Sequence, residues 1–159
     1  MSVCISAHHS GTLGGALNFQ TRQIPQAPSA AIDFGYGMEN FGRLQGYAGT
    51  SGDRWGILIE GAHLESDGFK QLDGGGNTGF DRNEVLAKAR YHTDPGEQTY
   101  HQFDARLGYA TELSNETYLG LTDADFSDTP YRRYSASEMG QMDWNRTQMR
   151  LGYYFAHEE

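Results

Sequence analysis

The sequence predicts an all-β protein: an antiparallel up-and-down meander of about six strands that forms part of a transmembrane β-barrel. Three observations predict this fold. Several segments alternate apolar and polar residues with a period of two, which is the pattern of strands. Both long connections fall at one end of the strands and tight turns fall at the other, an asymmetry typical of outer-membrane barrels. The composition is poor in apolar residues and rich in glycine and tyrosine.

Composition limits how the chain can fold. Only 37% of its 159 residues are apolar, whereas 21 are glycine and ten are tyrosine, and the mean hydropathy is -0.67. An ordinary globular domain carries more aliphatic residues. No run approaches the roughly 20 apolar residues of a membrane helix, so any membrane-spanning element must be a strand. A barrel tolerates this composition because only alternate residues face lipid.

Charge and cysteine content exclude some classes of function. The net charge of -9 argues against a nucleic-acid partner, which would need a basic patch. Cys4 is the only cysteine, so the chain has no intramolecular disulfide and no thiolate zinc cluster. The first residues lack the basic start and apolar stretch of a signal peptide. If the protein is exported, we therefore expect the chain to be a fragment or to have a wrong start.

The strands follow in order along the chain. Alternation predicts a first strand at residues 30–36, where Ile32, Phe34 and Tyr36 share one face, and a second at 41–50. Two further strands lie within residues 53–92, on either side of a glycine-rich loop at 65–82. The fifth and sixth strands are predicted at residues 98–110 and 146–155, and a long loop from Glu112 to about Asp143 joins them.

Short turns separate the other pairs of strands. Residues 37–40 are a turn with glycine at its head, and residues 51–53 form a tight connection. Residues 93–96 are a strong turn signal, in which Pro95 fixes φ and Gly96 is expected to supply a positive φ. Because successive strands run in opposite directions, the connections after the first, third and fifth strands lie at the same end of the sheet. Both long loops are among these connections.

Residues 13–25, LGGALNFQTRQIP, carry a family resemblance. A glycine pair permits a tight bend, residues 16–22 are a short strand candidate, and Pro25 stops strand pairing. The run resembles the last plug strand of TonB-dependent outer-membrane receptors, and within that family the ferric citrate and related siderophore receptors. The run in residues 117–134 is similar to the family's third loop. The positions that match the plug pattern are Gly14, Gly15, Leu17, Asn18, Thr21 and Arg22.

The resemblance implies two regions and a function. Residues 1–26 would be a ragged N-terminus and the C-terminal remnant of the plug domain, and residues 27–159 the N-terminal part of the barrel. The expected function is uptake of a ferric chelate, ferric citrate or a siderophore, across the outer membrane of a Gram-negative bacterium. The partners are the chelate, outer-membrane lipid and the TonB system, which acts through parts missing from this chain. Six strands with two unpaired edges are not expected to transport alone.

Candidate ligand contacts lie in the last long loop. Arg132 and Arg133, between Tyr131 and Tyr134, form a basic island among acidic residues. Guanidinium groups bind carboxylates in bidentate geometry, and tyrosines offer flat amphipathic surface. We hypothesise that these four residues contact an anionic ferric chelate. The alternative is a local ion pair with a nearby acid such as Asp128.

Arginines on the polar faces of the strands have a structural interpretation. In a filled barrel such arginines pair with acids of the wall or the plug, and Glu60, Glu84 and Asp104 are available. We interpret them as groups that dock a plug rather than as ligand contacts.

No enzyme motif, cofactor site or metal site is predicted. Asp123 and Asp125 lack the further ligands of a calcium loop and the defined separation of a glycosidase pair. The glycines at 74–76 lack the lysine of a phosphate-binding loop. His8 and His9 are adjacent, so on an extended segment they point to opposite faces, and no third ligand accompanies them.

Two other classes of protein remain open. One is a soluble extracellular β-domain, a sandwich or carbohydrate-binding module with a tyrosine platform, which would be monomeric without detergent. The other is a passive porin, which has no plug, so residues 13–25 argue against it.

Overall fold

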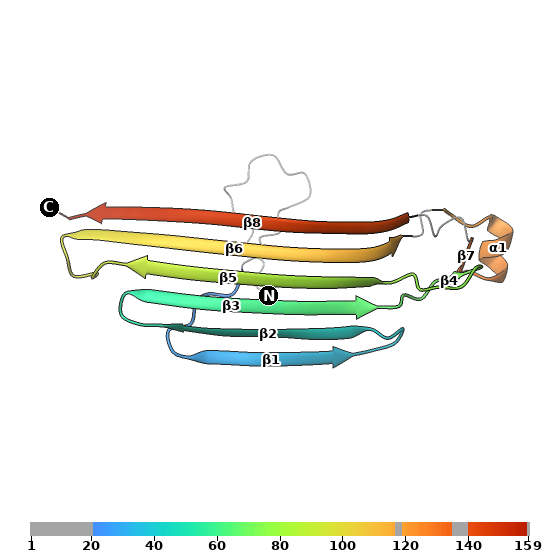
Figure 1. Ribbon diagram of the computed structural model, residues 1–159, viewed down its shortest axis with the longest axis horizontal. Coiled ribbons are helices and arrows are strands. Elements are labelled where there is room, and N and C mark those ends of the chain that lie inside the picture. Colours follow the sequence, from blue (N-terminus) through green and yellow to red (C-terminus); the bar gives the residue numbers. More distant parts are fainter. Residues whose placement is uncertain (1–20, 117–118, 135–139, 159) are drawn as a thin grey trace.

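A computed structural model describes residues 21–116, 119–134 and 140–158, whose six long strands form one open antiparallel sheet (Figure 1). Each strand pairs with the next long strand of the chain, and β1 and β8 form the two edges. The predicted all-β meander of six strands is confirmed, and the sheet is not closed into a barrel. The strands are β1 (Ser29–Tyr36), β2 (Gly42–Ser51), β3 (Trp55–Ser66), β5 (Phe80–His92), β6 (Thr99–Glu116) and β8 (Gly140–His157).

The connections divide between the two ends of the sheet as the sequence predicts. The turns from β2 to β3 and from β5 to β6 lie at one end, and the other connections lie at the opposite end (Figure 1). The long connections contain a short helix, α1 (Asp123–Asp128), and two short strands, β4 (Gln71–Leu72) and β7 (Arg132–Arg133). We call this end of the sheet the loop end. Among the described residues, no helix has the length and apolar character needed to cross a membrane.

Both long loops are shorter than predicted. Strand β6 continues to Glu116 and β8 begins at Gly140, so the predicted loop from Glu112 to Asp143 was wrong in extent. The loop predicted at 65–82 shortens in the same way, because β3 and β5 extend into it. The reason is that backbone hydrogen bonds continue along the ladder where alternation has ended, as at the polar pair Thr111 and Asn145.

The turns form where predicted, with different backbone geometry. Between β1 and β2, Glu39 and Asn40 have positive φ angles of 55° and 52°, rather than the glycine at the head of the turn. Between β5 and β6, the Glu97 amide donates to the Asp94 carbonyl at 3.2 Å. The prediction of positive φ at Gly96 was wrong. Because the central Pro95 and Gly96 both have negative φ, the turn is of type I.

The strand register sorts the side chains onto two faces. Paired residues share a face, so the apolar positions of all six strands fall together on one side, here called the apolar face. These side chains do not converge on a closed centre: Ile59 is 56% exposed and Met149 is 68% exposed. One row across the apolar face consists of Ala30, Ala48, Ile59, Ala87, Leu107 and Met149.

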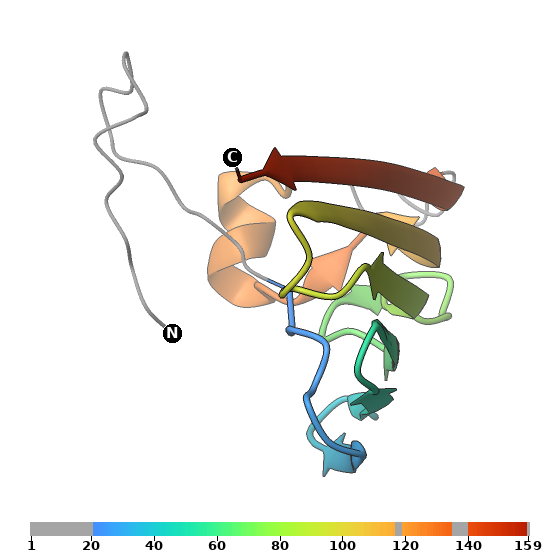
Figure 2. The same ribbon diagram turned by 90° about the vertical axis from the view of Figure 1, so that its left-hand side faces the viewer.

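The opposite side, here called the polar face, is partly covered by the described start of the chain. Figure 2 shows this segment along one side of the sheet. Beneath it lies Leu58, the one fully buried large side chain among the described residues. Of the strand predicted at 16–22, only Thr21 and Arg22 are described, and they belong to no strand. The other plug-motif residues, Gly14, Gly15, Leu17 and Asn18, lie outside the described residues.

Candidate functional site

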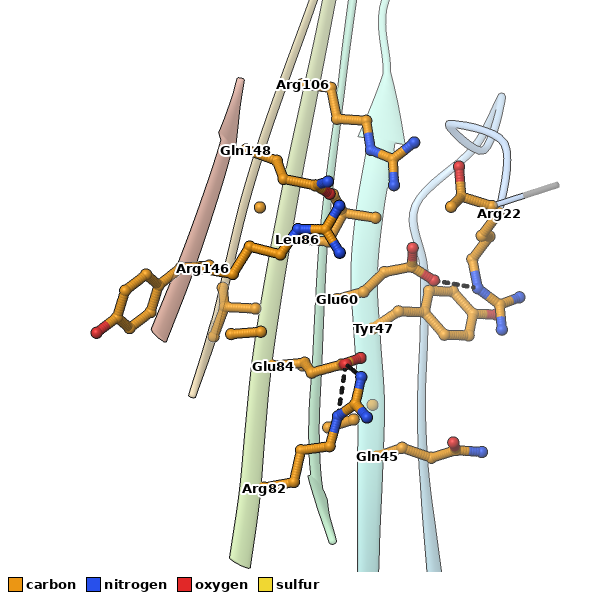
Figure 3. Close-up of a pocket in the computed structure, with 18 of the residues that line it drawn as sticks. Arg22, Gln45, Tyr47, Glu60, Arg82, Glu84, Leu86, Arg106, Arg146 and Gln148 are labelled. Atoms are coloured by element: carbon orange, nitrogen blue, oxygen red, sulfur yellow. Dashed lines mark hydrogen bonds and ion pairs between the residues drawn. The ribbon is translucent and has the colours of Figure 1, made fainter. Parts of the chain in front are cut away.

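The polar face carries an open hollow of about 540 Å³, lined by all six long strands and by residues 21 and 22. Figure 3 shows that its long side chains project from neighbouring strands toward the same space. The charged residues in the lining are Arg22, Asp33, Glu60, Arg82, Glu84, Arg106 and Arg146.

The three acids expected to pair with arginines each do so. Glu84 bonds Arg82 (Figure 3), Asp104 lies 2.7 Å from Arg90, and Glu60 lies 3.0 Å from Arg22. The first two pairs join groups of the sheet itself. The third pair joins the sheet to residues 21–25, the described part of the segment expected to end the plug.

Residues 21–25 are attached to the polar face by several polar contacts. The guanidinium of Arg22 lies over the ring of Tyr47, 3.8 Å from its centre. Lys88 donates from Nζ to Thr21 Oγ1 at 2.7 Å and to the carbonyl of Arg22. The Ser51 hydroxyl donates to the carbonyl of Pro25 at 2.7 Å. Thr21 and Arg22, the two described residues of the predicted plug motif, therefore both contact the sheet.

Two glycines let this segment approach the sheet closely. A Cβ on Gly49 would lie 2.8 Å from Cδ of Pro25, and a Cβ on Gly56 would lie 2.8 Å from Cγ2 of Ile24. Contacts this short do not occur between real carbon atoms. These two glycines of the polar face thus leave the space that the covering segment occupies.

A row of cations crosses the polar face. Lys88, Arg106 and Arg150 are register partners on three neighbouring strands. Like charges directly opposite one another destabilise a sheet. Within the described part of the chain, the guanidinium groups of Arg106 and Arg150 form no ion pair or hydrogen bond, although their backbones pair in the ladder. We call these three residues the cationic row; sequence reasoning missed it, because it becomes visible only once the register is known.

The predicted loop residues lie in a second cluster at the loop end of the sheet. Strands β4 and β7 pair in parallel, through hydrogen bonds from the Gln71 amide to the Tyr131 carbonyl and from the Asp73 amide to the Arg133 carbonyl. Arg132 then holds both carboxylate oxygens of Asp73, with N–O distances of 2.8 and 3.0 Å. The two long loops are thereby joined to one another.

Arg132 also binds α1. Its Nη1 lies 2.9 Å from Oδ1 of Asp125, while the Tyr134 hydroxyl donates to Oδ2 of the same residue at 2.5 Å. Hydrogen bonds from Tyr134, and then from Thr122, hold the pKa of Asp125 below its ordinary value. The hydrogen bond from Arg132 likewise lowers the pKa of Asp73, and both carboxylates raise the pKa of Arg132. The two acids that pair with Arg132 are thus Asp73 and Asp125 rather than Asp128.

Arg133 and Tyr131 remain differently placed. The Arg133 guanidinium donates to the carbonyls of Pro130 and Arg132, at 3.0 and 2.6 Å, and its charge meets no carboxylate in the described structure. Tyr131 is 56% exposed and packs edge-on against Phe69. Of the four predicted ligand contacts, Arg132 and Tyr134 hold the loops together, while Arg133 and Tyr131 keep groups available to solvent.

Comparisons of the chain with protein-family models, with curated proteins and with solved structures found no match.

Proposed function

We propose that the sheet is part of the wall of a TonB-dependent outer-membrane receptor that takes up a ferric chelate, such as ferric citrate or a siderophore complex. A ligand would bind at the loop end, outside the cell, and pass along the polar face once TonB moves the plug. The proposal rests on the residue pattern of the plug end and on the geometry of the two faces. Because both edges of the sheet are open, a transporting barrel needs further strands.

The observation that carries the proposal is the slant of the apolar run across the sheet. On β1 this run extends from Ala30 to Tyr36 and is centred on Asp33; on β8 it extends from Met149 to Phe155 and is centred on Gly152. Register partners lead from Asp33 across the sheet to Arg146, not to Gly152. The centre therefore shifts by six residues, from 146 to 152, across five strand-to-strand steps.

This shift converts to an angle. Six residues rise about 20 Å along a strand, and five strand spacings cover about 24 Å. A level apolar band then requires the strands to tilt by about 40°, within the range of about 35–45° found in transmembrane barrels. A soluble barrel tilts its strands by a similar angle but turns its apolar side chains inward, whereas the apolar face of this sheet is exposed. The slant therefore supports contact with a flat layer of lipid.

The polar face supports the second half of the proposal. The cationic row lacks acidic partners in the described chain for Arg106 and Arg150, and such a row calls for an anionic neighbour. A carboxylate-bearing plug or a carboxylate chelate in transit satisfies this requirement. Arg133, whose charge meets no described carboxylate, offers a first contact at the loop end.

The two tryptophans test membrane contact directly, because they occupy opposite faces. Trp55 lies on the apolar face in a row with Tyr91, Phe103 and Tyr153, and Trp144 lies on the polar face beside Arg82. In the Trp144→Phe variant, inserted into vesicles, we expect lipids brominated near the headgroup to quench Trp55 fluorescence strongly. In the Trp55→Phe variant we expect weak quenching of Trp144.

Each variant serves as the control for the other, since both keep one tryptophan. Equal quenching of the two residues, or no quenching of Trp55, would reject the membrane assignment and favour a soluble β-domain. Replacing both Arg132 and Arg133 with alanine in the full-length parent receptor tests chelate binding separately. Unchanged affinity for ferric citrate and unchanged iron uptake would remove this loop from the ligand site.

A further inference from the structure

Three metal-ligating side chains meet on the apolar face, at its border with the loop end. His63 and Glu65 come from β3, and Asp81 comes from β5. Asn83 of β5 is the register partner of His63, and Asp81 is the partner of Glu65. One ligand atom from each of His63, Glu65 and Asp81 lies within 4.8 Å of the other two.

The amide of Asn83 orients two of these groups. Its Nδ2 donates to Oδ1 of Asp81 at 2.7 Å, so its Oδ1 faces Nδ1 of His63 at 2.8 Å and accepts a hydrogen bond from that nitrogen. In the neutral imidazole this hydrogen bond favours the tautomer protonated on Nδ1. The lone pair then lies on Nε2, the nitrogen that faces the two carboxylates. Metal-bound histidines are commonly oriented by a hydrogen bond of this kind.

The separations around Nε2 suit an ion. Nε2 of His63 lies 3.6 Å from Oε2 of Glu65 and 3.9 Å from Oδ2 of Asp81. Both distances are too long for a hydrogen bond. Ligands held at about 2.1 Å around a tetrahedral zinc ion lie roughly 3.4 Å apart. Small side-chain rotations would therefore bring the three atoms onto one ion.

The negative charges of the two carboxylates also favour a bound cation. Glu65 and Asp81 stand directly opposite one another, an arrangement that like charges disfavour. Among the described residues, no lysine or arginine pairs with either carboxylate. Gly42, the neighbour of Glu65 on β2, leaves room for its side chain. Both carboxylates line an open hollow of about 500 Å³, so an ion can reach them from solvent.

We propose that His63, Glu65 and Asp81 bind a divalent transition-metal cation of the zinc class, with Asn83 as the positioning residue. One imidazole nitrogen and two carboxylate oxygens form a mixed donor set that suits such cations better than magnesium or calcium. The ion would join β3 to β5 at the base of the loop between them and neutralise the facing carboxylates. This site is independent of the proposed transport function.

Zinc alone is the probe, added to the full chain in detergent micelles. The substitutions Cys4→Ser, His8→Asn and His9→Asn are made first in every variant, so that these side chains cannot compete for the ion. Titration against a chromophoric chelator should then find one zinc ion per chain. We expect His63→Gln to weaken binding at least tenfold, and Asn83→Leu to weaken it by roughly 10–100-fold although all three ligands remain.

The matched control is His101→Gln. His101 lies on the same apolar face, bonded to the Tyr153 hydroxyl at 2.8 Å and remote from any carboxylate ligand set. It should leave zinc affinity unchanged. Circular dichroism confirms that each variant keeps its strands, and Glu65→Gln provides a second ligand variant if His63→Gln unfolds. Two results would overturn the proposal. One is no zinc binding by the chain that carries only the Cys4, His8 and His9 substitutions; the other is equal zinc binding by that chain and by the folded ligand variants.

Discussion

At the scale of single residues, Arg132 shows what a sequence conceals. The pair of arginines between two tyrosines is visible in the sequence, and its ability to bind carboxylates follows from guanidinium geometry. The partner could not be foreseen, because Asp73 lies 59 positions away in another loop. A nearby acid such as Asp128 was the natural expectation. The structure instead uses Arg132 to fasten one loop to the other.

Replacing Arg132 with lysine should loosen this connection. Lysine keeps the charge but cannot hold both oxygens of Asp73 in a planar fork. We expect the amides of Gln71 and Asp73, which donate to β7, to exchange hydrogen several-fold faster. The control is Arg133→Lys, because Arg133 bonds only carbonyls, to which an ammonium group also donates. Similar exchange in both variants would show that the fork contributes nothing.

Acid should separate the loops. The pKa of Asp73 is lowered by Arg132, and that of Asp125 by Tyr134 and Thr122, from the ordinary value of 3.8. With depressed folded-state pKa values, the carboxylates stabilise the contact above the unfolded value, and this stabilisation is lost as pH falls through the folded values. We expect the contact to persist from about pH 7 to about pH 5 and to break below about pH 3.8. Carboxyl carbon shifts measured by NMR should titrate with midpoints below 3.8; higher midpoints would contradict this.

At the scale of elements, the strands are readable from the sequence and the small elements between them are not. Alternation places all six long strands because one face is apolar throughout. Helix α1 was missed, although Thr122 and Asp125 have the spacing of a capping box. In the structure the Thr122 hydroxyl accepts from the Asp125 amide and donates to its carboxylate. The pairing of β4 with β7 had no sequence signal, since two residues show no period.

The fit between residues 21–25 and the sheet gives a second element-scale prediction. In Gly56→Ala the new methyl group would meet Cγ2 of Ile24 at 2.8 Å, so the segment must shift or leave. Overpacking of this kind costs about 1–3 kcal/mol. We expect trypsin to cleave after Arg22 faster in this variant. Gly108→Ala is the control, because its nearest heavy atom on the same face lies 3.7 Å away; equal cleavage rates would show that the segment is not packed here.

At the scale of the whole molecule, the exposed apolar face is where the proposed membrane contact can be tested. In vesicles, an arginine at Ile59, near the centre of the apolar run, should cost about 2–4 kcal/mol of folding free energy, whereas one at Leu113, near the loop end, should cost about 0–1 kcal/mol. Denaturant titration measures both. The two positions share a face and have similar exposure, 56% and 43%. If both substitutions cost under about 0.5 kcal/mol, the face is bathed by water.

Much of the architecture of the whole molecule was predictable from the sequence. The two-residue alternation indicates strands with one apolar and one polar face, and the lengths of the connections indicate which end of the sheet carries the long loops. The register of the strands was not predictable. Three features depend on it: the slant of the apolar run, the cationic row, and the proximity of His63 to Asp81. His63 and Asp81 are 18 positions apart, so searching for neighbouring ligands finds His8 and His9 instead.

Strands β6 and β8 are each 18 residues long. At about 3.3 Å per residue and a tilt of about 40°, each strand would span roughly 45 Å along the membrane normal. The hydrocarbon core of a bilayer is about 30 Å thick. The surplus lies beyond the apolar run, toward α1. In the proposed membrane protein, this surplus would form a two-stranded stalk that holds the joined loops above the headgroups, so that a solute would meet the loops before it met the lipid surface.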